Sequence, residues 1–163
     1  MYLLELIISE WQILVETKAL FLLGISALCG ALVGLEREHA EKPAGLRTNM
    51  FICVGSCLFT LASIFSWKYI SGEPTTIDPG RIAAQIVSGV GFLGAGVILK
   101  TKAGDIIGIT TASTIWLVAA IGMIIGLGFP LLGSVIALST TGLLFILGRI
   151  ELAIFFSPKE RDD

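Results

Sequence analysis

The sequence predicts an all-α polytopic membrane protein with five transmembrane helices, preceded by an N-terminal amphipathic helix at the membrane surface. Hydrophobic residues make up 55% of the 163 residues and charged residues only 15%, whereas soluble domains are about 25% charged. The mean hydropathy is +0.90, and the apolar residues are concentrated in five long runs. The net charge of −2 gives no indication of a nucleic-acid partner. The partner that this composition implies is the lipid bilayer.

Residues 1–18 are expected to form the amphipathic helix. Their apolar clusters are interrupted by Glu5, Glu10, Glu16 and Lys18, which is too much charge for a helix that crosses the bilayer. Apolar and charged residues mixed in this way are typical of a helix that lies along the interface. The segment also lacks the basic start of a signal peptide.

Residues 19–150 are expected to form the membrane domain, because each apolar run is close to the roughly 20 residues that cross a bilayer as a helix. The second run ends near the interfacial aromatic residues Trp67 and Tyr69. Residues 151–163 are expected to form a short cytoplasmic tail. The five predicted spans cover residues 19–35, 50–67, 82–99, 109–127 and 131–150.

The distribution of positive charge orients these helices. Eight of the eleven Lys and Arg residues fall on one side of the predicted bundle and three on the other. Because cytoplasmic loops are enriched in Lys and Arg, the richer side is expected to be cytoplasmic. The N-terminus is then outside and the C-terminus inside. The richer side carries Arg37, Lys42, Arg47, Lys100, Lys102, Arg149, Lys159 and Arg161.

Four glycines in the third predicted span, Gly89, Gly91, Gly94 and Gly96, have the spacing G-x-G-x-x-G. Dinucleotide-binding loops share this spacing, but no strand precedes it and no acidic residue follows about twenty positions later, so a nucleotide site is not expected. Glycines in a transmembrane helix instead let neighbouring helix backbones approach closely. They also weaken the helix, so a break that exposes carbonyl groups to an ion is the alternative.

Pairs of glycines four residues apart extend this packing signal to two other spans. We therefore expect the first, third and fourth spans to form the tight core, and a glycine face to support a homodimer. Cys53 and Cys57 are expected to act as small packing residues in the second span. The fifth span is rich in Leu and Phe and is expected to face lipid. The pairs are Gly30 with Gly34 in the first span and Gly122 with Gly126 in the fourth.

Three polar residues lie at the start of the third predicted span. Asp78 precedes Arg81, where its carboxylate can cap the helix and pair with the guanidinium. Gln85 follows Arg81 by four residues and shares its helix face. These residues either form an interfacial ion pair or line a functional site, and both interpretations remain open.

A charged connector, residues 36–47, is expected between the first and second spans. It contains Glu36, Arg37, Glu38, Lys42 and Arg47. Its acids and bases can neutralise one another in a compact hairpin. Alternatively, free carboxylates could hold Mg²⁺, which takes only one or two of them and keeps waters. The metal candidates are Glu36, Glu38 and Asp78, and no other cofactor is expected.

No nucleophile elbow, zinc motif or phosphate loop occurs in a suitable context, so an enzyme is not expected.

Three segments nevertheless form a recognisable set: residues 34–48 (GLEREHAEKPAGLRT), 78–98 (DPGRIAAQIVSGVGFLGAGVI) and 108–116 (GITTASTIW). Together they resemble the MgtC/SapB family of bacterial inner-membrane proteins. The resemblance covers roughly residues 19–150.

By this resemblance, the protein would be a regulator of other membrane proteins, including ATP synthase, associated with adaptation to low magnesium and with virulence. Many members continue into a soluble cytoplasmic domain, whereas this sequence stops at Asp163, so an activity that depends on such a domain is not expected. The sequence therefore predicts a non-enzymatic regulator of membrane transport. The alternative is a transporter or channel for Mg²⁺ or another cation, with Asp78 and Gln85 lining the route and the connector as a gate.

Overall fold

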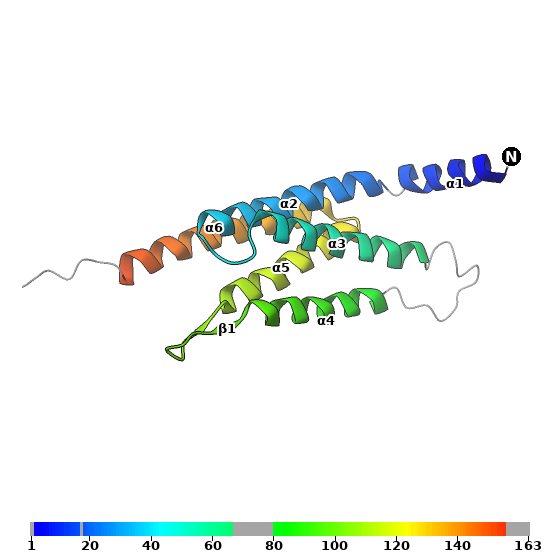
Figure 1. The fold of residues 1–163 in the computed structure, drawn as a ribbon. Helices are drawn as coiled ribbons and strands as arrows, with labels where there is room; N and C mark the ends of the chain where they lie inside the picture. Colours follow the sequence, from blue (N-terminus) through cyan, green and yellow to red (C-terminus); the bar gives the residue numbers. More distant parts are fainter. Residues whose placement is uncertain (1, 17, 67–79, 156–163) are drawn as a thin grey trace, which may run out of the picture.

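The computed structural model describes residues 2–16, 18–66 and 80–155 as a helical bundle with one short β-hairpin (Figure 1). Within these residues, four helices are long and apolar enough to cross a membrane, and a shorter apolar stretch covers Ala84–Val97. The predicted all-α polytopic fold is therefore confirmed. Asp78, Trp67, Tyr69 and the end of the predicted tail lie outside the described residues. The helices are α1 (Tyr2–Glu16), α2 (Ala19–His39), α3 (Leu46–Phe65), α4 (Gly80–Val97), α5 (Ile109–Gly126) and α6 (Pro130–Phe155).

Helix α1 has an exposed apolar stripe. It follows the course of α2 in Figure 1, and Lys18, with φ 51°, lies at the junction. The stripe residues recur at helical spacing, so they form one face that suits contact with lipid. The position of α1 at the membrane interface stays a prediction. The exposed stripe consists of Leu4, Ile7, Ile8, Trp11 and Val15.

Helix α3 packs between α2 and α5. It approaches α2 closely at Gly30, where an added Cβ would lie 2.7 Å from the Cys53 Cβ. It approaches α5 at Gly122 and Gly126, where an added Cβ would meet the carbonyl oxygens of Cys53 and Cys57, respectively. Small residues on both sides therefore let the three backbones come together.

The closest backbone contacts thus join the first, second and fourth spans, and α3 is missing from the core predicted for the first, third and fourth spans. The third span, α4, contributes Ile86 and Val90 to a second apolar cluster with Ile115 and Ala119 of α5. The G-x-x-x-G pairs of α2 and α5 both pack against α3, whose contact residues are Cys53 and Cys57 rather than glycines. Both cysteines are fully buried. A glycine on one helix needs only a small residue opposite, so glycine spacing alone does not identify the partner helix.

Buried hydroxyl groups in this core bond to carbonyls of their own helices. Ser26 Oγ donates to the Leu23 carbonyl at 2.8 Å, and Thr60 Oγ1 donates to the Ser56 carbonyl at 2.8 Å. Such local bonds satisfy a hydroxyl without a partner helix or ligand. The polar residues of the core are consequently compatible with an apolar environment.

Helix α4 lies at the edge of the bundle, against α5 and α3. A Cβ added at Gly94 would lie 3.6 Å from the Ala112 Cβ on α5. For Gly89, Gly91 and Gly96, no described atom would come within 4 Å of an added Cβ. Three of the four glycines of the G-x-G-x-x-G set therefore lie on a surface that the rest of the described chain leaves open.

Helix α6 packs against α2 and α5 through a narrow face that includes Ala137 and Thr140. Most of its large apolar side chains are exposed, among them Leu131, Leu138 and Leu143. This is the outer surface expected for a helix that faces lipid.

The segment between α4 and α5 is a two-stranded antiparallel hairpin. Strand β1 (Leu99–Lys100) pairs with β2 (Ile106–Ile107), with Leu99 opposite Ile107. Thr101 closes the turn, because its Oγ1 accepts a hydrogen bond from the Asp105 amide at 3.1 Å. Gly108 then starts α5 at φ 91°, a conformation that favours glycine.

Candidate functional site

The charged residues predicted to form a loop after the first span lie mainly on a helix. Helix α2 continues to His39, and α3 already begins at Leu46. The predicted connector over residues 36–47 is therefore too long at both ends, and only residues 40–45 connect the helices. Alternating acidic and basic residues are good helix formers, whereas Pro43 and the positive φ angles of Glu41 (53°) and Ala44 (61°) break the helix.

Glu36 and Arg37 form a nearly buried ion pair in the last turns of α2. Their side chains are 11% and 5% exposed. Arg37 Nη2 donates to Glu36 Oε1 at 2.6 Å, and Arg37 Nε donates to Glu36 Oε2. Both carboxylate oxygens are thus engaged by one guanidinium. Of the two functions considered for these charges, this geometry favours mutual neutralisation over metal binding.

Glu38 joins the end of α2 to the start of α3. Its Oε2 accepts a hydrogen bond from the Leu46 amide at 2.8 Å, which satisfies one free amide of the first turn of α3. A Cβ at Gly45 would lie only 2.8 Å from the same oxygen. Glycine at position 45 therefore leaves the space through which the carboxylate reaches the amide.

Asn49 supports the hairpin formed by α2, residues 40–45 and α3 (the α2–α3 hairpin) from inside the bundle, and the sequence did not single it out as a site residue. Its side chain is fully buried, and its Nδ2 donates to the Gly45 carbonyl at 3.0 Å and to the Ala44 carbonyl. Its Oδ1 has no hydrogen-bond partner among the described residues. The sequence feature that could have identified Asn49 is an amide side chain in the first turn of an apolar helix, four residues after the Gly of a Pro-Ala-Gly turn.

Replacing Glu38 with alanine is expected to destabilise the α2–α3 hairpin by about 1 kcal/mol, because a capping acceptor is lost. The free energy of unfolding in detergent, measured by titration with a denaturing detergent, checks this value. Glu41→Ala is the matched control, since Glu41 is an exposed acid in the same loop. Equal effects of the two substitutions would show that the Glu38 cap does not contribute.

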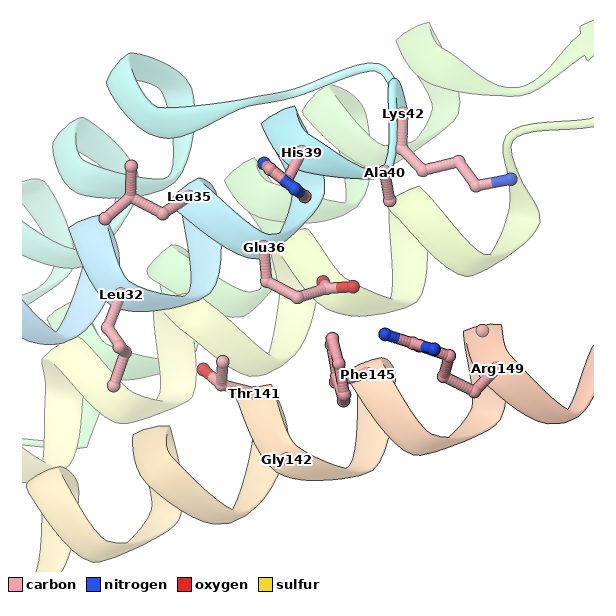
Figure 2. Close-up of a pocket in the computed structure, with 11 residues that line it drawn as sticks. Leu32, Leu35, Glu36, His39, Ala40, Lys42, Thr141, Gly142, Phe145 and Arg149 are labelled. Atoms are coloured by element: carbon pink, nitrogen blue, oxygen red, sulfur yellow. The ribbon is translucent and has the colours of Figure 1, made fainter.

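A first groove, the α2–α6 groove, opens beside this hairpin and has a volume of about 850 Å³. Figure 2 shows Glu36 and Arg149 pointing into the space between the two helices. The Arg149 guanidinium lies over the Phe145 ring, 5.2 Å from its centroid. The groove therefore combines apolar and charged walls. Its walls include Leu32, Leu35 and Glu36 of α2, Lys42 of the loop, and Phe145 and Arg149 of α6.

A second groove, the α3–α4 groove, has a volume of about 560 Å³ and is mainly apolar. Its lining residues recur every four positions, so each helix contributes a single face. Gln85 and Gly89, both predicted as site residues, come together on the α4 wall. The residues that define this groove are Phe51, Gly55 and Phe59 of α3 and Gln85, Gly89 and Leu93 of α4.

The remaining predicted site residues are dispersed. Arg47 is exposed on the first turn of α3 and Arg81 is exposed at the start of α4. Asp78 lies outside the described residues, so its predicted pair with Arg81 stays a prediction. Within the described ranges, no three His, Cys, Asp or Glu residues form a group that could hold a metal ion. Mg²⁺ binding at Glu36, Glu38 or Asp78 likewise stays a prediction.

The membrane-length helices and the small-residue core define a polytopic membrane protein. The chain belongs to the MgtC family, whose sequence model matches residues 23–153, and the predicted resemblance is thereby confirmed. Protein SapB of Bacillus subtilis is 45% identical over 122 residues, which are 74% of this chain and 51% of that protein. No solved structure matches the chain.

Two further relatives carry names that refer to magnesium or to the family. Putative magnesium transporter YhiD of Escherichia coli K12 is 50% identical over 106 residues, which are 64% of this chain and 48% of that protein. Protein MgtC of Salmonella typhimurium LT2 is 46% identical over 101 residues, which are 62% of this chain and 40% of that protein. The chain thus spans about half or less of the length of these relatives.

Proposed function

We propose that this MgtC-family protein is a non-enzymatic regulator of another membrane protein and acts in adaptation to low magnesium. Family membership and the name of the Escherichia coli relative support the link to magnesium. The bias of positive charge supports an inner-membrane topology with the N-terminus outside and the C-terminus in the cytoplasm. ATP synthase, which the family resemblance implies, is the first candidate partner.

The observation that carries this proposal is the α3–α4 groove. Helices in lipid associate by close packing, because lipid chains are as apolar as the side chains that they would replace. Gly55 and Gly89 leave hollows in this surface, since no described atom would lie within 4 Å of a Cβ at either position. A ridge of side chains on a partner helix fits between such glycines, with Phe51 and Phe59 beside it.

Gln85 adds a polar contact to this apolar surface. Its side chain is exposed and lines the groove near the start of α4. An amide at this depth forms hydrogen bonds across helix interfaces, typically worth about 0.6–2 kcal/mol each. The groove therefore favours a transmembrane helix that carries a small or polar residue opposite Gln85. A second copy of this chain is the alternative occupant.

Filling the groove is expected to abolish regulation. In liposomes that contain ATP synthase and this protein, the rate of ATP-driven proton pumping should differ from the rate in liposomes with ATP synthase alone. Gly89→Leu should return pumping to the rate measured with ATP synthase alone, because filling the groove weakens binding of the partner helix. Each 1.4 kcal/mol of binding free energy lost makes this binding about ten-fold weaker. Gly24→Leu is the matched control, since Gly24 is an exposed glycine of α2 outside both grooves. Unchanged pumping with wild-type protein would exclude ATP synthase as the partner.

A photo-crosslinking amino acid at position 85 identifies the occupant. A crosslink to an ATP synthase subunit supports the proposal, whereas a crosslinked product of twice the mass of this chain indicates a homodimer through the same face. Either product should disappear in the Gly89→Leu background. A crosslink that persists in this background would show that the occupant does not lie in the groove.

Cation transport is the second candidate, because one relative is named a putative magnesium transporter. In that function Asp78 and Gln85 would line the route along α4. Liposomes with this protein alone and an internal Mg²⁺ indicator separate the two functions. A regulator gives no flux above empty liposomes. A flux that falls with Asp78→Ala or Gln85→Ala would replace the regulator with a transporter.

A further inference from the structure

We propose that the α2–α6 groove binds one anionic phospholipid, with its phosphate at Lys42 and Arg149 and an acyl chain along Leu32, Leu35 and Phe145. This proposal concerns a different surface from the α3–α4 groove and does not depend on the regulatory function. The argument rests on the order of side chains along the groove, on their charge and on the volume between the helices.

Polar and apolar side chains are ordered along this groove in the same sense as in a lipid. Leu32 and Leu35 precede the charged end of α2, and Thr141 and Phe145 precede Arg149 on α6. Both helices run toward the same side of the bundle, so their charged ends meet at one end of the groove, as Figure 2 shows. That end is where a phosphate group would lie, and the apolar walls extend toward the bilayer centre.

The charge at this end favours an anion. Lys42 and Arg149 have no ion-pair partner among the side chains that the structure describes. The acid in the groove, Glu36, is neutralised by Arg37, which engages both of its oxygens. His39 lines the same end and can donate a further hydrogen bond. Basic pockets between transmembrane helices on the cytoplasmic side bind anionic lipid headgroups in this way.

Two features keep the site open. The Phe145 ring holds the Arg149 guanidinium at the wall, 5.2 Å from the ring centroid, which limits its movement into water. Gly142 lines the groove, and no described atom would lie within 4 Å of a Cβ there. The resulting volume of about 850 Å³ accommodates a headgroup and the upper part of an acyl chain.

Native mass spectrometry of the full chain, delipidated in detergent and titrated with phosphatidylglycerol, tests this proposal. We expect one tightly bound phosphatidylglycerol and much weaker binding of phosphatidylcholine. Lys42→Gln and Arg149→Gln should each weaken phosphatidylglycerol binding roughly five-fold, as expected for one surface cation. Lys100→Gln is the control, because Lys100 is an exposed cation of the β-hairpin outside the groove. Equal affinity for both lipids would overturn the proposal.

Gly142→Leu tests the acyl chain separately from the charges. It fills the groove between α2 and α6 while Lys42 and Arg149 are retained, so phosphatidylglycerol binding should fall and the melting temperature without lipid should change little. Inorganic phosphate at millimolar concentration provides the last comparison. If it displaces phosphatidylglycerol, or if Gly142→Leu binds lipid as the wild type does, the groove is a phosphate site and the lipid proposal is wrong.

Discussion

Gly122→Ala is expected to be among the most damaging single substitutions in this protein. The added Cβ would overlap the Cys53 carbonyl oxygen and would lie 3.0 Å from the Ser56 Cβ. A backbone carbonyl in the middle of a helix cannot move aside as a flexible side chain can. Overpacking of this kind costs about 1–3 kcal/mol or more, so a loss near the upper end is expected in detergent unfolding experiments.

Gly24→Ala is the matched control for this loss. Gly24 also lies within a helix, but no described atom would come within 4 Å of its Cβ. The same chemical change should leave stability unchanged or slightly raise it, because alanine is the better helix former. If both variants unfold at the wild-type denaturant concentration, α3 and α5 do not approach as closely as the structure indicates.

The second large effect is expected for Arg37→Met. This substitution leaves the Glu36 carboxylate, whose side chain is 11% exposed, without the guanidinium that neutralises it. Removing one partner of a buried ion pair typically costs about 3–5 kcal/mol, because the remaining charge is buried without compensation. The cost should appear as a lower free energy of unfolding and as reduced accumulation in the membrane.

The double variant Glu36→Gln/Arg37→Met distinguishes the loss of the pair from the loss of packing. Without either charge, most of the stability should return, since uncharged substitutes for a buried pair are often neutral. An additive loss would show that the two side chains contribute independently. Glu36→Gln alone also tests metal binding: Mg²⁺ should protect wild-type and variant protein equally against heating, because Arg37 already occupies both carboxylate oxygens.

The two grooves lie on different helix pairs and can be tested independently. The α2–α6 groove adjoins the α2–α3 hairpin, which carries the Glu36–Arg37 pair. The α3–α4 groove adjoins glycines of α4 that no other described residue covers. Variants that remove lipid binding at Arg149 therefore leave Gln85 and Gly89 in place. If lipid binding contributes to regulation, Arg149→Gln should reduce the effect of this protein on ATP synthase while the Gln85 crosslink persists.

The sequence by itself determined the membrane class, the helices and the family. Apolar runs of membrane length form helices in lipid whatever segments surround them. In lipid, the backbone groups of each segment must be hydrogen-bonded, and a helix satisfies them within the segment itself. The paired glycines predict close approach of helix backbones, and at Gly30 and Gly122 an added Cβ would meet backbone atoms of α3.

Only the tertiary structure decided which helices and side chains meet. It placed α3 between α2 and α5, extended α2 through Glu36 and Arg37, and brought the Glu38 carboxylate to an amide in the first turn of α3. Hydropathy reflects the free energy of transferring each residue into lipid, which does not depend on its neighbours. These contacts depend instead on how each helix is rotated about its axis and on the angle at which it crosses helices far away in the sequence. For the same reason, Glu36 and Arg37, which the sequence placed in a connector, form a nearly buried pair on the last turns of α2.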